Sequence, residues 1–275
     1  MERRGGSDEF RNQDRTVPPR AEIISRRRYD GVIFELDGVV ANTVELHFAA
    51  WKETFDALLR TIDGRQFEPF NREEFRQFVD GKPRDEAIVS FLDARGINRP
   101  LGEELPAADE AMTHETDTVY GLAKMKRRLF VQRIESGQLR VGGDARGFLH
   151  QLVRAGIKTA VVSPSEYARR VLSILDLEAL FDEIVDATTF SEEHLSGKPT
   201  SDIFMEATTR LKIPRDRAVV IESDRPSIEV GRAAGFGLIV VLATGGAEKK
   251  KFLGRGADLA VESLGELKVK ETSEP

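Results

Sequence analysis

The feature that most constrains this chain is the segment YDGVIFELDGVVANT, which covers residues 29–43. Its apolar run, Val32–Phe34, is short and uninterrupted, which is typical of a strand buried on both faces of a parallel sheet. Two acids, Glu35 and Asp37, follow together with a glycine, and a helical pattern begins directly afterwards. In open α/β sheets the ligand site lies beyond the carboxyl ends of the strands. The segment therefore predicts a strand that delivers two acidic side chains to such a site.

Further strand and helix patterns alternate after residue 142. The apolar runs bounded by turn residues are Thr159–Val162, Glu183–Val185, Ala218–Ile221, Leu238–Leu242 and the weaker Leu259–Val261. The helical patterns between them are Ala145–Ala155, Glu166–Leu175, Ser201–Leu211 and Ser227–Ala234. Such alternation predicts a doubly wound α/β core with helices on both faces of a parallel sheet.

Residues 44–142 carry helical patterns and no convincing strand. These patterns are Val44–Leu59, Arg72–Val79, Asp85–Ala94 and Thr113–Glu135. An all-helical insertion after the first strand emerges at the carboxyl edge of the sheet, so it predicts a cap over the ligand site. The expected division is a core at 29–43 and 143–268, with a helical cap at 44–142.

Composition narrows the class of protein. The 275 residues include no cysteine, which excludes disulfides and thiolate metal sites. No long apolar run is present, so we expect a cytoplasmic protein without a membrane segment. The net charge of −6 gives no reason to expect nucleic-acid binding.

The two chain ends are expected to lie outside the folded core. Residues 1–28 are polar and lack periodicity, which predicts a disordered tail. A basic docking arm around Arg26–Arg28 is the alternative, although interspersed acids weaken it. Residues 269–275 are expected to form a short C-terminal tail.

Polar side chains follow several of the predicted strands and one loop. They are Glu35 and Asp37, then Ser163, then Lys198 in the loop SGKP, and then Glu222, Ser223 and Asp224. Carboxylates with a hydroxyl and a lysine at one sheet edge suit a hard cation together with a phosphoryl group. Each signal is weak alone, because a serine after a strand is often a helix N-cap and a loop lysine is often solvated.

The segment at 29–43 resembles the first motif of the haloacid dehalogenase (HAD) superfamily, Asp-x-Asp-Gly-Val, whose core is Rossmann-like. Three cap segments resemble its β-phosphoglucomutase and phosphosugar phosphatase branch. They are TVELHFAAW at 43–51, VDGKPRD at 79–85 and LAKMK at 122–126. The resemblance spans about residues 29–265.

The resemblance implies a role for each matching position. Glu35 holds the nucleophile position and Asp37 that of the general acid/base. The implied phosphate and substrate binders are Ser163, Lys198, Arg84, His47 and Lys126, with Arg84 at the distal phosphate. The implied Mg²⁺ ligands are Glu35, Asp37 through its carbonyl, and Glu222, with Asp224 as a further candidate. Without the family, His47 and Trp51 at i and i+4 suit ordinary helix packing, and Arg84 suits a surface ion pair.

Three positions depart from the family pattern. Glu35 replaces the nucleophilic Asp, Ser223 replaces a metal-binding Asp, and Asn42 replaces a frequent Asp. The extra methylene of Glu35 moves its carboxylate by roughly 1–1.5 Å, and a misplacement of about 1 Å can cost ~10²-fold in rate. Mg²⁺ usually needs a carboxylate or two, which a serine hydroxyl does not supply.

Two functions remain open at this point. The first is a Mg²⁺-dependent phosphosugar phosphatase or phosphomutase whose catalysis is impaired. The second is a non-catalytic protein that binds a small phosphorylated sugar. Halide displacement fits poorly, because the resemblance expects an Asp at position 35 in dehalogenases as well. Either open function places Glu35, Asp37, Ser163, Lys198 and Glu222 around one cleft.

Overall fold

The predicted parallel sheet is present, and the motif strand lies at its centre. A computed structural model describes residues 23–80, 82–102, 116–193, 201–223 and 225–270. Its main sheet has the strand order β4-β3-β2-β5-β6-β7, and every pairing is parallel. The strands are β2 (Gly31–Glu35), β3 (Lys158–Val162), β4 (Glu183–Val185), β5 (Ala218–Glu222), β6 (Leu238–Leu242) and β7 (Leu259–Val261). All six predicted strands are confirmed.

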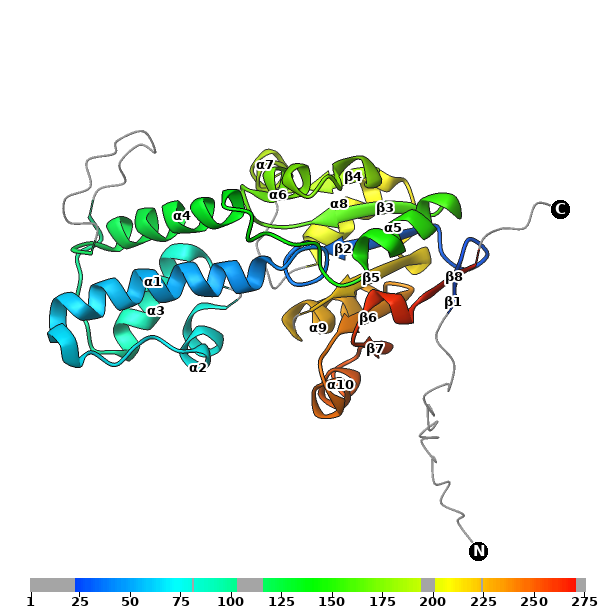
Figure 1. The fold of residues 1–275 in the computed structure, drawn as a ribbon. Coiled ribbons are helices and arrows are strands. Elements are labelled where there is room, and N and C mark those ends of the chain that lie inside the picture. The colour runs from blue at the N-terminus through cyan, green and yellow to red at the C-terminus, as the bar shows by residue number, and fades with distance from the viewer. Residues whose placement is uncertain (1–22, 81, 103–115, 194–200, 224, 271–275) are drawn as a thin grey trace, which may run out of the picture.

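Helices cover both faces of this sheet (Figure 1). The core helices are α5 (Ala145–Arg154), α6 (Ala168–Ile174), α7 (Ala187–Glu192), α8 (Asp202–Leu211), α9 (Arg225–Ala234) and α10 (Gly246–Leu253). Because successive side chains of a strand point to opposite faces, Val32 and Phe34 pack with α5 and α6, whereas Ile33 packs with α8 and α9. The sequence patterns missed α7 and α10, which have six and eight residues and give too little periodicity to detect.

Short helical turns complete the connections. They are η1 (Gly64–Gln66), η3 (Glu178–Leu180), η4 (Arg215–Arg217) and η5 (Leu264–Glu266).

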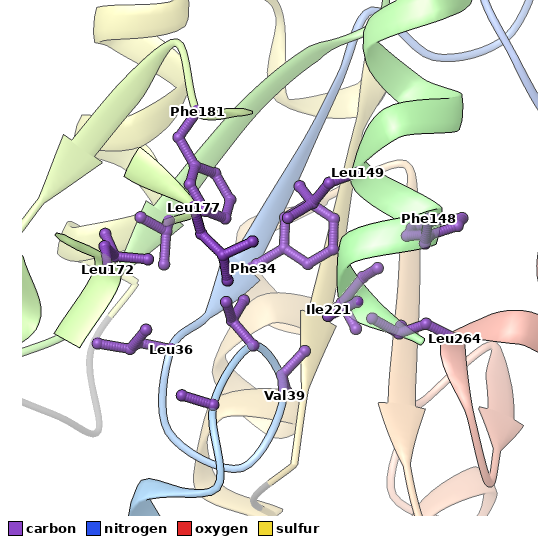
Figure 2. Packing of buried hydrophobic residues seen from close by; sticks show 14 of the residues in the cluster. Phe34, Leu36, Val39, Phe148, Leu149, Leu172, Leu177, Phe181, Ile221 and Leu264 are labelled. Atoms are coloured by element: carbon purple, nitrogen blue, oxygen red, sulfur yellow. The ribbon is translucent and has the colours of Figure 1, made fainter. Parts of the chain in front are cut away.

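Phe34 organises the face of the sheet below α5 and α6. Its ring meets the ring of Phe148 on α5 at 6.0 Å and that of Phe181 at 5.9 Å, both edge-to-face. Figure 2 shows these rings together with Leu149, Leu172 and other apolar side chains around the end of β2. This packing holds the end of β2 in place, from which the loop that carries Asp37 continues.

In the described residues of the insertion between β2 and α5, all the named elements are helical. Its elements are α1 (Thr43–Asp63), α2 (Arg72–Glu74), the π-helical turn η2 (Phe75–Val79), α3 (Arg84–Ala94) and α4 (Val119–Glu135). The helices α1 and α4 lie side by side and point away from the sheet (Figure 1). A separate aromatic cluster that includes Trp51, Phe55, Phe70 and Phe91 packs among these helices. The cap therefore has its own apolar core.

Two cap helices differ from their predicted extent. The pattern at 72–79 was predicted as one helix, but α2 begins at the capping box of Asn71 and passes into η2 after Glu74. The helix predicted from residue 113 begins at Val119 instead, because the Thr118 hydroxyl caps the Gly121 amide at 3.0 Å. Residues 113–115 lie outside the described residues.

The two connections between core and cap run beside each other. Ala41 pairs with Val141, and the Gly142 amide donates to the Val40 carbonyl at 2.8 Å. A side chain at Gly142 would place its Cβ 2.3 Å from the Val39 carbonyl oxygen, so this close approach requires glycine. These contacts hold the root of the cap against the loop that follows β2. The exact boundaries at residues 44 and 142 stay predictions.

The predicted tails were both too long. Residues Ile23–Ser25 form β1, which pairs in parallel with β8 (Lys268–Lys270) in a separate two-stranded sheet. Ile24 is fully buried against the α5 face of the core. The β8 sequence Lys-Val-Lys has a single apolar residue, and the pairing joins opposite ends of the chain, so local patterns did not predict these strands. Residues 1–22 and 271–275 lie outside the described residues.

Helix length also bears on membrane association. The cap helix α1 is 21 residues long and carries several charged side chains. Across the described ranges, we find no helix that combines the length and the apolarity needed to span a membrane.

The first prediction concerns the core around Phe34. Replacing Phe34 with Ala should lower the free energy of unfolding by about 3–5 kcal/mol, because a fully buried ring leaves a cavity. Urea unfolding measures this change. Val153→Ala on the exposed side of α5 is the control and should change the free energy by less than about 0.5 kcal/mol. Equal effects of the two substitutions would contradict the assigned core.

Candidate functional site

Two buried acids stand next to each other at the carboxyl edge of the sheet. Glu35 is the last residue of β2 and Glu222 the last residue of β5, and their predecessors Phe34 and Ile221 are paired in register. Glu35 is 2% exposed and Glu222 is 0% exposed. Adjacent strands lie about 4.8 Å apart, so these two side chains occupy neighbouring positions on the same face. The parallel register alone brings them together.

The loop after β2 presents Asp37 between three hydroxyl groups. Thr43 donates to one carboxylate oxygen of Asp37, and Ser163 donates to the other at 3.4 Å. The Ser223 hydroxyl donates instead to the backbone carbonyl of Asp37 at 3.2 Å. Asp37 is therefore held by α1, by the end of β3 and by the end of β5.

Gly38 is required by this arrangement. Its φ of +81° lies in the region that favours glycine. A Cβ there would lie 2.9 Å from the Ser223 hydroxyl oxygen. The loop can therefore approach Ser223 only because residue 38 has no side chain.

Ser163 is fixed at the end of β3. Its amide donates to the Val185 carbonyl of the neighbouring strand at 3.0 Å, and its hydroxyl accepts from the Ser165 amide at 3.2 Å. Ser163 is 1% exposed. The hydroxyl is consequently held beside Asp37 at the base of the cap.

His47 and Lys126 meet across α1 and α4. The Lys126 Nζ lies 2.8 Å from His47 Nδ1, and the His47 ring stacks on Phe130 with centroids 3.9 Å apart. Lys126 Nζ also lies 5.1 Å from the centre of the Trp51 ring and 5.0 Å from that of Phe130. The lysine is thus enclosed by rings rather than by solvent.

This enclosure changes the titration of both groups. Burial, and then the positive charge of Arg84, lower the pKa of Lys126 to about 7, against smaller opposing effects of the Asp37 and Glu166 carboxylates. Burial and then the charge of Lys126 hold the pKa of His47 well below its usual range. A buried lysine that titrates near neutrality is a candidate for a functional role.

Arg84 begins α3 and faces the core across the seam between the two parts. Its Nη1 lies 3.7 Å from Glu166 Oε1, in the loop that follows β3. Arg127 on α4 reaches the other oxygen of Glu166 at 3.3 Å and donates to the Tyr167 hydroxyl at 2.5 Å. The sequence reasoning singled out Arg84 but missed Glu166, Arg127 and Tyr167, which no local pattern marks.

Asn42 has a structural role in this fold. Its side-chain oxygen accepts from the Arg140 amide at 2.7 Å, and its amide group donates to the Gln138 carbonyl at 3.4 Å. These bonds tie together the two connections between core and cap. The sequence reasoning also overlooked Thr43, although Thr43 lies within the first motif.

Two predicted site residues, Lys198 and Asp224, lie outside the described residues. In the part of the chain that the structure describes, no group of three or more His, Cys, Asp or Glu side chains is arranged to hold a metal ion.

A pocket of about 240 Å³ borders the loop that carries Asp37. Gly38, Ser223, Thr244 and Glu248 are among its lining residues. The predicted phosphate and cap residues described above do not line it. We therefore place the candidate site at the seam between core and cap, not in this pocket.

Comparison with known proteins decides the family. The signature of the family described as haloacid dehalogenase-like hydrolase matches residues 29–235. The chain belongs to this family. It is 37% identical over 244 residues to the beta-phosphoglucomutase of Mycobacterium bovis, covering 86% of this chain and 90% of the relative.

Solved structures agree with the fold of this HAD protein. A beta-phosphoglucomutase from Clostridium difficile superposes with a TM-score of 0.67 at 21% identity, covering 87% of this chain and 93% of that one. CbbY from Rhodobacter sphaeroides, solved as a mutant with xylulose-(1,5)bisphosphate, gives a TM-score of 0.64 at 23% identity, covering 88% and 97%. The protein is thus a HAD-family member of the phosphatase and phosphomutase kind, related to beta-phosphoglucomutase.

The second prediction uses the titration of Lys126. Between pH 7 and the usual lysine range the unfolded chain binds the proton that the folded chain has lost, so raising the pH favours the folded state. From pH 7 to pH 9 this effect should add about 1–3 kcal/mol to the free energy of unfolding. Lys126→Met should remove this increment, as urea unfolding at each pH would measure.

Lys124→Met, on the same helix and half-buried, is the matched control and should retain the increment. Parallel pH profiles of the Lys126→Met variant and the unmodified protein would contradict the assigned environment of Lys126.

Proposed function

We propose that this HAD protein binds a small phosphorylated sugar between core and cap, and that its phosphatase or phosphomutase activity is impaired. One observation carries the second part of the proposal. The Ser223 hydroxyl donates to the Asp37 carbonyl at 3.2 Å, at two positions where the family resemblance implies metal ligation. At position 223 a hydrogen-bond donor therefore stands where the resemblance implies a metal ligand. The Asp37 carbonyl, the second implied ligand, accepts a hydrogen bond from it.

Relatives and local chemistry support the phosphosugar. The related protein from Mycobacterium bovis is named a beta-phosphoglucomutase, and CbbY was solved with a sugar bisphosphate. In this chain Ser163 lies beside Asp37, and Lys126 and His47 project from the cap helices. Hydroxyl, amine and imidazole groups can donate hydrogen bonds to the oxygens of a phosphoryl group.

The oxygen donors of the site match only part of what Mg²⁺ requires. The ion demands near-octahedral oxygen ligation and usually takes one or two carboxylates. Glu35 and Glu222 offer carboxylates and Asp37 offers its carbonyl, but that carbonyl already accepts from Ser223. Within the described ranges no third acidic or histidine side chain completes the group. The described donors therefore fit Mg²⁺ poorly.

The nucleophile position is also altered. Glu35 ends a strand that is paired on both sides and buried on both faces, so the backbone cannot retreat to compensate for a longer side chain. Its carboxylate is displaced by roughly 1–1.5 Å from the place an Asp would occupy, and ~10²-fold in rate is the cost of about 1 Å. Asp37, in contrast, remains held by Thr43 and Ser163, where it can hold or release a proton.

A non-catalytic phosphosugar-binding protein is the second candidate. The altered positions favour it. Glu35 stands at the implied nucleophile position and Ser223 at an implied metal-ligand position, whereas the implied binding residues Ser163 and Lys126 are present. The two candidates differ in whether any turnover accompanies binding.

The third prediction is a rescue of activity. The unmodified protein should release phosphate from phosphosugars very slowly, and Glu35→Asp with Ser223→Asp should exceed either single variant. The two residues act on one attack geometry and should couple by about 0.5–3 kcal/mol beyond additivity. Phosphate release across a phosphosugar panel with Mg²⁺ measures this.

Asp37→Asn in the double variant is the control and should abolish the gained activity. Substantial turnover by the unmodified chain, lost on Asp37→Asn, would contradict impairment and restore a fully active enzyme.

The fourth prediction separates binding from metal. A phosphosugar should raise the melting temperature in EDTA, because a ligand at 100 times its dissociation constant stabilises by about 2.7 kcal/mol. Lys198→Ala should abolish this shift, whereas Lys270→Ala on β8, far from the cap in Figure 1, should retain it. If no phosphosugar shifts the melting temperature with or without Mg²⁺, the proposed ligand is wrong.

A further inference from the structure

One carboxylate on the core joins two arginines of the cap. Glu166 Oε1 lies 3.7 Å from Arg84 Nη1, and Glu166 Oε2 lies 3.3 Å from Arg127 Nη2. The two arginines come from different cap helices, α3 and α4, whereas Glu166 belongs to the loop that begins with Ser163. The bridge therefore spans the seam between the core and the cap.

This bridge is part of the candidate site. The charges of Arg84 and Glu166 both act on Lys126, as does the carboxylate of Asp37. Through Tyr167 the bridge also continues into the rings that surround His47, because Tyr167 lies 5.8 Å from Phe130 and Phe130 stacks on His47. The bridge is therefore in contact, through Tyr167 and Phe130, with the cap residue His47.

The exposure of the bridge argues against a mainly stabilising role. The side chains of Arg84, Arg127 and Glu166 are 39%, 39% and 43% exposed. Ion pairs with this much solvent contact contribute little to folding stability. A carboxylate between two guanidinium groups does, however, change which ligand those groups can accept.

The chemistry of the bridge disfavours a second anion. A phosphate that approached Arg84 or Arg127 would meet the negative charge of Glu166, which lies within ion-pairing distance of both guanidinium groups. A sugar hydroxyl carries no charge and can both donate to the Glu166 carboxylate and accept from a guanidinium group. The seam around Arg84, Arg127 and Glu166 is therefore suited to sugar hydroxyl groups.

We propose that Glu166 is a specificity-determining residue, which makes the seam around Arg84 and Arg127 accept the hydroxyl groups of a sugar monophosphate and reject a second phosphate. The inference rests on the proposed function, since it names the class of phosphosugar that the same site takes. Glu166 acts through Arg84 and Arg127, whose positive charges it partly neutralises.

The test compares two probes that differ by one phosphate, glucose 6-phosphate and glucose 1,6-bisphosphate. Dissociation constants are measured by calorimetry in EDTA for the full chain and for Glu166→Gln, which removes the charge and keeps the shape. The unmodified protein should bind the monophosphate at least as tightly as the bisphosphate. Glu166→Gln should bind the bisphosphate at least about tenfold more tightly than the unmodified protein, with less than about threefold change for the monophosphate.

Two further variants make the assignment specific. Glu135→Gln is the matched control, because Glu135 on α4 also pairs across the seam, with Arg170, but does not contact Arg84 or Arg127. It should leave both affinities unchanged. Arg84→Met added to Glu166→Gln should cancel most of the gain for the bisphosphate, since the freed guanidinium group would be gone.

The outcomes separate this inference from the proposed function. If both proteins bind the monophosphate and Glu166→Gln gains nothing for the bisphosphate, the inference is overturned and the proposed function stands. An equal gain in Glu135→Gln would also overturn it, because any loosened seam would then suffice. If neither protein binds either probe, both the inference and the proposed function are wrong.

Discussion

The burial of β2 between β3 and β5 is the constraint on which the site depends. The strand is hydrogen-bonded on both sides and packed by helices on both faces, so its last residue has no freedom to shift along the sheet. The loop carrying Asp37 leaves from that fixed point, and Ser163 and Ser223 meet it from the two neighbouring strands. This edge of the sheet is consequently rigid on the core side.

The cap side of the site is built by different forces. Aromatic rings enclose His47 and Lys126, and ion pairs with Glu166 reach across to the core. The site thus has a rigid core edge and a charged seam. Under the proposed function, the core edge suits chemistry at phosphorus and the seam suits discrimination between sugars.

This division gives meaning to where the chain departs from its family. Glu35 and Ser223 alter the core edge of the site, and a buried strand leaves little room to accommodate either change. Glu166 lies in the seam instead, where partly exposed side chains can exchange partners. Under the proposed function, the changes at the core edge affect the rate, whereas Glu166 affects which ligand binds.

The sequence by itself determined the six strands of the main sheet, the helical insertion and the acids at the end of the first strand. These features are local, since apolar runs and helical periodicity are written over a few consecutive residues. Tertiary structure alone decided the pairing of β1 with β8, the hydrogen bond from Ser223 to Asp37 and the bridge from Glu166 to Arg84. The partners in these contacts are 82 or more residues apart, and only the folded sheet and its seam bring them within reach of each other.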